Sequence, residues 1–269
     1  MSPLSSELSS ARILVGFSPE RLSALSLGGF LRPRLLDRHA VTLHGQDAGE
    51  WAQGLPALET LLAEPAWKGG RIVVVLSGHY VRHAILPEGR GLSDGERQTL
   101  AAAVFRDAFG ELARDWDLRV SPAAGGRRTL ASGVPRALLA ALRATCVAHG
   151  RLHSIRPALM PVFNRVRREI GDSVACLALV EPGRTTLACV GDGQWQSIDS
   201  RAGDASALPQ LLLEESELNQ RQPGGILWLC DLTDGARLPA DSFWSLRRIA
   251  PPALAGANGI ANLAAWGAA

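Results

Sequence analysis

A strand–turn–strand pattern occurs twice in this chain of 269 residues, and the two copies lie about half a chain apart. The first copy covers residues 12–27 and turns at residues 18–20, a polar trio that is typical of hairpins. The second copy covers residues 174–190 and turns at residues 181–183, and a third strand is predicted at 195–198. Two similar hairpins, each opening half of the chain, predict a two-lobed α/β fold with a cleft between the lobes.

The same order of elements follows each hairpin. In the first half, residues 51–63 form a predicted helix with four leucines on one face, and the apolar run 71–76 follows it. Such a run after a crossover helix is typical of a buried central strand. In the second half, a predicted helix at 208–219 precedes the apolar run 226–230. The duplication lies in this pattern alone, because the residues themselves do not repeat.

An insertion separates the elements of the first half. Residues 80–87 alternate like a half-exposed strand, and Ser93 with Glu96 forms a capping box that opens a helix. Two short strands, 116–121 and 128–132, predict an antiparallel ribbon. Pro135 then suits the first position of a further helix.

These elements define the predicted domains. The first lobe covers residues 11–172 and carries the insertion at about 78–134, and the second lobe covers residues 173–269. Residues 1–10 are polar and rich in serine, so we expect them to be disordered.

Composition excludes several classes of protein. The 28 basic and 26 acidic residues nearly balance, which argues against an extended nucleic-acid track, and the cluster Arg165, Arg167 and Arg168 is interpreted as a solvated helix face. No apolar stretch approaches the roughly 20 residues that span a bilayer, and the N-terminus lacks a signal-peptide pattern. We therefore expect a cytoplasmic protein that does not itself insert into a membrane.

Four cysteines each stand alone within apolar runs, and none has the spacing of a zinc site. We interpret all four, Cys146, Cys176, Cys189 and Cys230, as buried free thiols in a reducing compartment. Cys176 and Cys189 are placed to face each other across the second hairpin, which implies proximity and no chemistry.

Two histidine patterns are candidates for reactive sites. His79 and His83 would form a zinc pair on a helix, but they fall on a predicted strand with no third ligand. The triplet Ser77-Gly78-His79 lacks the flanking glycine of a nucleophile elbow, so it is interpreted as a turn. The sequence therefore predicts no metal site and no catalytic residues.

The duplicated layout resembles the ribonuclease H-like fold that actin and sugar kinases share. The run 71–87, which leads into the insertion, and the return through HGRLHSIRPALMPVFNRVR are similar to PilM and GspL-type proteins. These are cytoplasmic actin-like components of type IV pilus and type II secretion machines. The resemblance covers roughly residues 12–250. It implies an α/β, actin-like (ribonuclease H-like duplicated) two-lobed fold with an inserted αββ subdomain.

Members of this group that bind ATP carry an aspartate in each phosphate turn, which positions Mg²⁺ while backbone N–H groups hold phosphate. Here Gly16 stands where the first aspartate is expected, and Pro19 removes an N–H donor. In the second turn Glu181 lies beside Pro182, where it is either a substitute acid or an exposed turn residue. We therefore expect no ATP or magnesium cofactor. The candidate contacts, should a nucleotide bind, are Ser18, Glu181, Gly183 and Thr185.

The resemblance implies a non-catalytic cytoplasmic scaffold, peripheral to the inner membrane through a partner. In PilM-like proteins a short N-terminal peptide of a membrane partner docks against the inserted subdomain. The candidate partner-binding residues here are Tyr80, Arg82, Ile85, Arg119 and Arg128. The expected partner is an inner-membrane assembly protein of a pilus or secretion system, with an assembly ATPase as a further candidate. GspL continues into a membrane helix and this chain does not, so we expect recruitment by another protein, or a soluble portion of a longer one.

Two alternative functions stay open from the sequence. One is a divergent nucleotide-binding ATPase or sugar-kinase relative, and the other is an actin-like polymer former.

Overall fold

The computed structural model describes residues 11–29, 33–43, 48–89, 91–121, 127–203, 205–218, 225–233, 235, 243–252 and 262–269. The prediction of disorder for residues 1–10 lies outside these residues. Internal contacts divide the chain into two units. The first unit consists of Met1–Tyr80, Arg136–Pro161 and Ala250–Ala269, and the second consists of Val81–Pro135 and Val162–Ile249.

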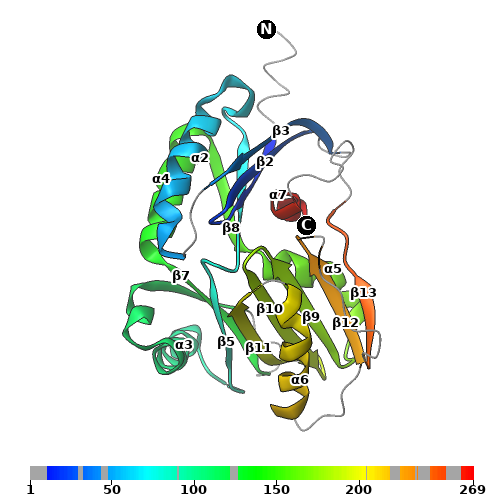
Figure 1. The fold of residues 1–269 in the computed structure, drawn as a ribbon. Helices are drawn as coiled ribbons and strands as arrows, with labels where there is room; N and C mark the ends of the chain where they lie inside the picture. The colour runs from blue at the N-terminus through cyan, green and yellow to red at the C-terminus, as the bar shows by residue number, and fades with distance from the viewer. Residues whose placement is uncertain are drawn as a thin grey trace. The chain divides into compact units, whose positions relative to one another are not determined.

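The first unit is built on a five-stranded sheet with the order β3-β2-β1-β4-β8 (Figure 1). Its strands are β1 (Arg12–Phe17), β2 (Arg21–Gly28), β3 (Arg34–Thr42), β4 (Arg71–Leu76) and β8 (Arg151–Pro157). Strand β1 pairs antiparallel with β2 and parallel with β4, and β4 pairs parallel with β8. The prediction of a buried central strand at 71–76 is confirmed, since β4 lies inside the sheet and only its first residue is exposed.

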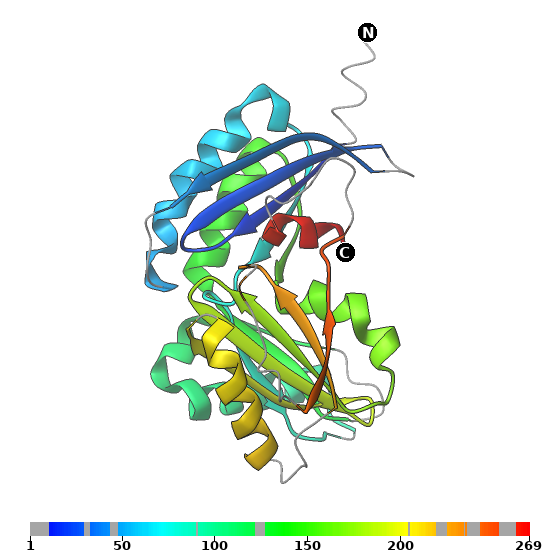
Figure 2. The same cartoon turned by 45° about the vertical axis from the view of Figure 1, so that its right-hand side comes forward.

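Helices cover both faces of this first sheet. A 3₁₀ turn (Ala48–Gln53) leads into α2 (Gly54–Ala63), a second 3₁₀ turn (Pro65–Trp67) follows it, and α4 spans Arg136–His149. Helices α2 and α4 lie side by side on one face, and α7 (Asn262–Ala265), followed by a 3₁₀ turn (Trp266–Ala268), lies on the other (Figures 1 and 2). Helix α4 begins at Arg136, whereas Pro135 ends a strand, so the prediction of a helix-initiating Pro135 is wrong by one position.

The second unit also holds a five-stranded sheet, with the order β11-β10-β9-β12-β13. Its strands are β9 (Ala175–Glu181), β10 (Arg184–Gly191), β11 (Gln194–Ala202), β12 (Gly225–Asp231) and β13 (Trp244–Arg248). A 3₁₀ turn (Ala205–Ala207) leads into α6 (Leu208–Leu218), which lies on the opposite face from α5 (Leu159–Ile170) (Figure 2). Leu208, Leu211 and Leu212 of α6 pack on alternate residues of β9 and β12, as the 2- and 3.6-residue periods require.

The predicted insertion forms a small sheet of its own, with the order β5-β7-β6. It contains β5 (Arg82–Leu86), α3 (Asp94–Phe109), a 3₁₀ turn (Gly110–Asp115), β6 (Trp116–Val120) and β7 (Thr129–Pro135). The predicted capping box is confirmed: the Glu96 amide donates to Ser93 Oγ and the Ser93 amide donates to Glu96 Oε2. Phe105 of α3 anchors the core beneath this sheet.

The two units differ from the predicted contiguous lobes. Residues 81–135, predicted within the first lobe, group with the second sheet, and residues 250–269, predicted within the second lobe, group with the first. The physical reason at the C-terminus is burial, because Ala264 and Ala265 of α7 pack against Leu14 of β1. Most of α5 likewise belongs to the second unit although it follows β8 of the first.

The prediction of four free thiols is wrong for one pair. Cys176 of β9 and Cys189 of β10 occupy directly opposed positions in the hairpin and form a disulfide, with their Cα atoms 4.1 Å apart. The pair is buried beneath α6. Cys146 and Cys230 are free and buried, as predicted. Burial raises the pKa of the Cys146 thiol to about 12.

Candidate functional site

Gly16, which stands where the resemblance expects the first aspartate of a phosphate-binding turn, is closely packed on the side where a side chain would project. Gly16 lies in β1 with its α-carbon facing α7, and a β-carbon placed there would lie 2.6 Å from the backbone nitrogen of Ala264 and 2.9 Å from Leu263 Cβ. It would also lie 2.6 Å from Ser23 Oγ on the neighbouring strand. These distances are shorter than van der Waals contacts between such atoms. An aspartate, which the resemblance expects at this position, has no room for its side chain.

Ser18 is occupied by the turn itself. Its hydroxyl donates to the carbonyl oxygen of Arg21 (2.9 Å) and accepts from the Arg21 amide (3.1 Å), while its own amide donates to the same carbonyl. This candidate nucleotide contact therefore closes the hairpin between β1 and β2.

In the second turn, Pro182 and Gly183 connect β9 to β10, and Gly183 has a φ of 70°. A proline followed by a residue with positive φ is typical of a type II turn. Glu181 is only 2% exposed, so the interpretation of this residue as an exposed turn residue is wrong. It ends a buried strand, since the turn begins one residue later.

The Glu181 charge acts on two neighbouring groups, the Arg184 guanidinium and the Cys230 thiol. Burial lowers the pKa of Arg184, and the Glu181 charge opposes this effect. Burial also raises the pKa of Cys230, and the charges of Glu181 and Asp231 add to the rise. Among the described residues, no group of three or more acidic, histidine or cysteine side chains is arranged to hold a metal ion. Thr185 is fully buried, and its hydroxyl contacts the carbonyl oxygen of Gly203 at 3.5 Å.

Ser18 belongs to the first unit, whereas Glu181, Gly183 and Thr185 belong to the second. Ser18 and Gly183 lie in hairpin turns of their own units, and Glu181 and Thr185 lie in the strands β9 and β10.

The two histidines considered as a metal pair lie in different environments. His79 follows β4, is buried, and has its Nδ1 2.9 Å from Ser77 Oγ. His83 lies on β5 with its Nδ1 2.9 Å from Ser132 Oγ. Burial, together with the charge of Arg82, lowers the pKa of His83 to about 4, so its imidazole is neutral at physiological pH.

Of the five predicted partner-binding residues, Tyr80 is the least accessible. It is 3% exposed, and its ring lies against Phe17 with centroids 5.6 Å apart. Arg82 is half-buried, and burial and the nearby Arg184 lower its pKa. Ile85 is half-buried on β5, while Arg119 is exposed on β6, 3.3 Å from Asp117 Oδ1.

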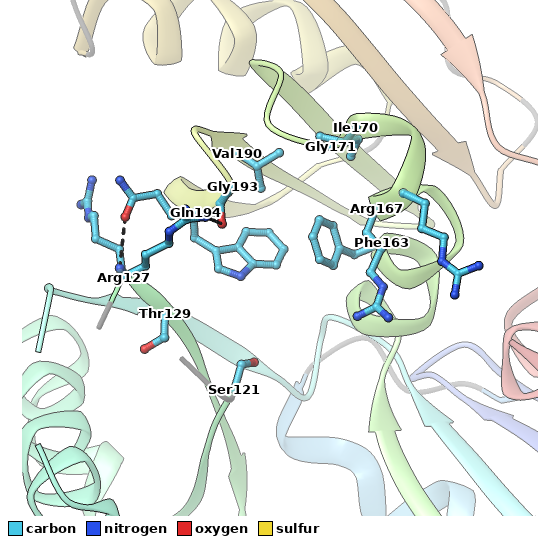
Figure 3. A pocket seen from close by; sticks show the side chains of 13 residues that line it. Ser121, Arg127, Thr129, Phe163, Arg167, Ile170, Gly171, Val190, Gly193 and Gln194 are labelled. Atoms are coloured by element: carbon cyan, nitrogen blue, oxygen red, sulfur yellow. Dashed lines mark hydrogen bonds between the residues drawn. The ribbon is translucent and has the colours of Figure 1, made fainter. Parts of the chain in front are cut away.

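Arg128, the fifth residue, lines a pocket of about 510 Å³ that lies wholly within the second unit. Three parts of the second unit form its walls: residues next to the end of β6 and the start of β7, residues of α5 from Phe163 onward, and the hairpin between β10 and β11 (Figure 3). The lining residues are Ser121, Arg127, Arg128, Thr129, Phe163, Arg167, Arg168, Ile170, Gly171, Val190, Gly193, Gln194 and Trp195.

Sequence reasoning found Arg128 and identified Arg167 and Arg168 as exposed, but it missed the pocket. Its aromatic part is Phe163 against Trp195, whose ring centroids lie 4.4 Å apart. The two rings are 32 positions apart in the chain, so no local pattern connects them. The charge cluster at residues 165–168 was the one signal that could have pointed to this wall.

The chain matches no protein-family model, and no curated protein is detectably similar to it in sequence. Solved structures do resemble it. A structure described as the PilM–PilN type IV pilus biogenesis complex aligns over 91% of this chain and 89% of that chain, with 12% identity and a TM-score of 0.65. The cytoplasmic domain of EpsL, an inner-membrane component of the Vibrio cholerae type II secretion system, aligns over 89% and 90%, with 14% identity and a TM-score of 0.57.

A Bacteroides thetaiotaomicron protein of unknown function with an actin-like ATPase fold aligns over 87% of both chains, with 12% identity and a TM-score of 0.58. At these identities the likeness shows the fold. The predicted actin-like fold is confirmed, as is the structural resemblance to PilM and GspL-type proteins.

Proposed function

We propose that this protein is a non-catalytic scaffold of a type IV pilus or type II secretion-like inner-membrane assembly. In this role it binds a cytoplasmic segment of a membrane partner and uses no nucleotide. It acts at the cytoplasmic face of the inner membrane and is held there by that partner. Within the described residues, none of the helices combines the length and the hydrophobicity that crossing a bilayer requires.

The close packing around Gly16 is the observation that best supports a protein without catalytic activity. An actin-like ATPase needs an acid near its phosphate turn to position Mg²⁺. Here helix α7 fills the space that such a side chain would occupy, and the nearest obstruction is backbone, which a rotamer change cannot relieve. Glu181, the other candidate acid, is buried beside Arg184 at the end of a strand.

The scaffold part is supported by the fold shared with PilM of the PilM–PilN complex and with the EpsL cytoplasmic domain. The small sheet offers a place for a partner, because β6 is an edge strand and carries the exposed Arg119. An extended segment can add to such an edge through main-chain hydrogen bonds. One acceptor of this edge, the carbonyl of Leu118, already receives the Gln98 side-chain amide.

Affinity purification from cross-linked native membranes tests the proposal. The tagged protein should enrich an inner-membrane component of a pilus or secretion assembly relative to a tag-only control. Arg119→Glu should weaken this recovery if the partner uses the β6 edge, whereas Arg114→Glu, an exposed change outside the sheet, should leave it intact. Recovery of no such component from membranes in which the assembly is present would contradict the proposal.

A further inference from the structure

The pocket of the second unit concentrates positive charge on two facing sides. Arg127 and Arg128 come from the ribbon, and Arg167 and Arg168 come from α5. Figure 3 shows Arg127 beside Gln194 and Gly193 on one side, and Arg167 beside Phe163 on the other. None of the 13 lining residues is acidic.

Arg127 and Arg128 have neutral hydrogen-bond partners in the described part of the chain. The Arg127 guanidinium contacts the carbonyl oxygen of Gly193 at 3.4 Å, and that of Arg128 contacts Gln196 Oε1 at 3.5 Å. Both bonds are at the long end for N–H···O geometry. Asp192 is exposed next to the hairpin, and Asp172 lies close to Arg127, because both side chains reach the point where a β-carbon on Gly193 would lie. Neither carboxylate lines the pocket. Asp172 offsets part of the Arg127 charge, but the charged residues that line the pocket are all arginines, and a concave site focuses their charge.

Apolar side chains lie between the two charged sides. Phe163 and Trp195 pack ring against ring, and Ile170 and Val190 complete this surface. Trp195 is 8% exposed and Val190 is 7% exposed, so the surface is shaped by buried side chains rather than by loose ends. A ligand that fills the pocket must present an apolar group in the middle and anionic groups toward both sides.

We propose that this pocket binds a short acidic peptide segment of the partner, with an apolar side chain seated against Phe163 and Trp195. The inference rests on the proposed function in taking the ligand to be a protein segment. Arginine pairs with carboxylates through two parallel hydrogen bonds, which suits aspartate and glutamate side chains. A bilayer surface fits this site less well, because its headgroups would have to enter a pocket walled by three chain segments.

A phage-displayed library of short random peptides, selected on the whole protein, tests the inference. The enriched peptides should carry aspartate or glutamate on both sides of an apolar residue. Binding of a fluorescein-labelled copy should weaken by at least about tenfold in the Arg127→Glu/Arg167→Glu variant. The milder Arg127→Gln/Arg167→Gln variant should weaken it as well. All of these positions are exposed, so the variants should keep the wild-type melting temperature.

Arg165→Glu is the matched control, because Arg165 is exposed on α5 but does not line the pocket. This variant should bind the peptide as the wild type does. The inference is overturned if no acidic peptide is enriched, or if the Arg127/Arg167 variants bind as tightly as Arg165→Glu does. Flotation with phosphatidylglycerol vesicles that requires Arg127 and Arg167, without peptide enrichment, would assign the pocket to lipid and overturn it too.

The membrane purification separates the inference from the proposed function. If the assembly component is recovered equally by wild type and by Arg127→Glu/Arg167→Glu, the pocket inference fails and the proposed function stands. If acidic peptides bind through the arginines but no assembly component is recovered, the pocket stands as an acidic-peptide site and the proposed function fails.

Discussion

Gly16 has a packing role that a mutation can measure. In Gly16→Ala the new methyl group would meet the backbone of Ala264 and the side chain of Ser23. Overpacking of this kind costs about 1–3 kcal/mol, so the free energy of unfolding should fall by that amount in urea denaturation. Gly95→Ala in α3 is the matched control, because a β-carbon placed there would have open space around it and alanine favours helices. Equal stabilities for Gly16→Ala and the wild type would show that α7 does not close this position.

His83 should make stability depend on pH. Its pKa is about 4 in the folded protein and 6.5 for an imidazole free of such surroundings, so the unfolded chain binds a proton first as pH falls. The stability that the protein has with neutral His83 is fully present above pH 6.5, and it is lost progressively between pH 6.5 and about 4. The melting temperature of His83→Gln should therefore fall less than that of the wild type between pH 7 and pH 5. Identical losses in the two proteins would refute this environment for His83.

Sequence patterns predict features formed by residues close together in the chain, but they do not predict burial and contacts that depend on distant segments. Ser93 and Glu96 form the expected capping box because both partners lie within one helical turn. Because Glu181 adjoins a Pro-Gly turn, the local sequence allows an exposed turn residue there, yet the strand pairing of the sheet buries it. Tyr80 was assigned to a partner surface, but its contact with Phe17 comes from a strand more than 60 positions earlier.

The hairpin of β9 and β10 is held by a cross-strand disulfide that can be counted chemically. Protein unfolded without reductant should titrate two thiols, those of Cys146 and Cys230, although the chain has four cysteines. Reduction should lower the free energy of unfolding by about 2–3 kcal/mol, because the Cys176–Cys189 bond closes a short loop. The Cys146→Ala/Cys230→Ala variant should show the same loss on reduction. Four titratable thiols in the wild type would contradict the disulfide.

Helices α5 and α7 show that a helix is easier to predict from the sequence than the unit of the fold to which it belongs. The sequence also predicts a helix from Pro157 to Ile170 and a short one from Ile260 to Trp266, close to the observed Leu159–Ile170 and Asn262–Ala265. Their partners were not predictable in the same way, since α7 packs on β1 from the other end of the chain. The pocket shares this property, because its lining residues come from three distant parts of the chain: Ser121 with 127–129, 163–171 and 190–195.

At the scale of the whole molecule, the fold is actin-like, and Gly16 in its first hairpin is closely packed against α7. The layout of two hairpins was enough to predict the fold, because each hairpin opens a sheet with the same order of strands. The order β3-β2-β1-β4-β8 in one unit matches β11-β10-β9-β12-β13 in the other at corresponding strands. Function is a separate matter, since one fold serves many activities and the site decides among them.

Binding of Mg-ATP by the whole protein distinguishes a scaffold that uses no nucleotide from an actin-like ATPase. A ligand that binds only the folded state raises its stability by RT ln(1 + L/Kd), where L is the free ligand concentration, so a thermal shift at millimolar Mg-ATP reports a site whose Kd is well below the ligand concentration. An actin-like ATPase in the same assay supplies the positive control. We predict that the melting temperature of this protein stays unchanged with Mg-ATP. A rise of several degrees that Mg²⁺ alone does not produce would contradict a scaffold that uses no nucleotide.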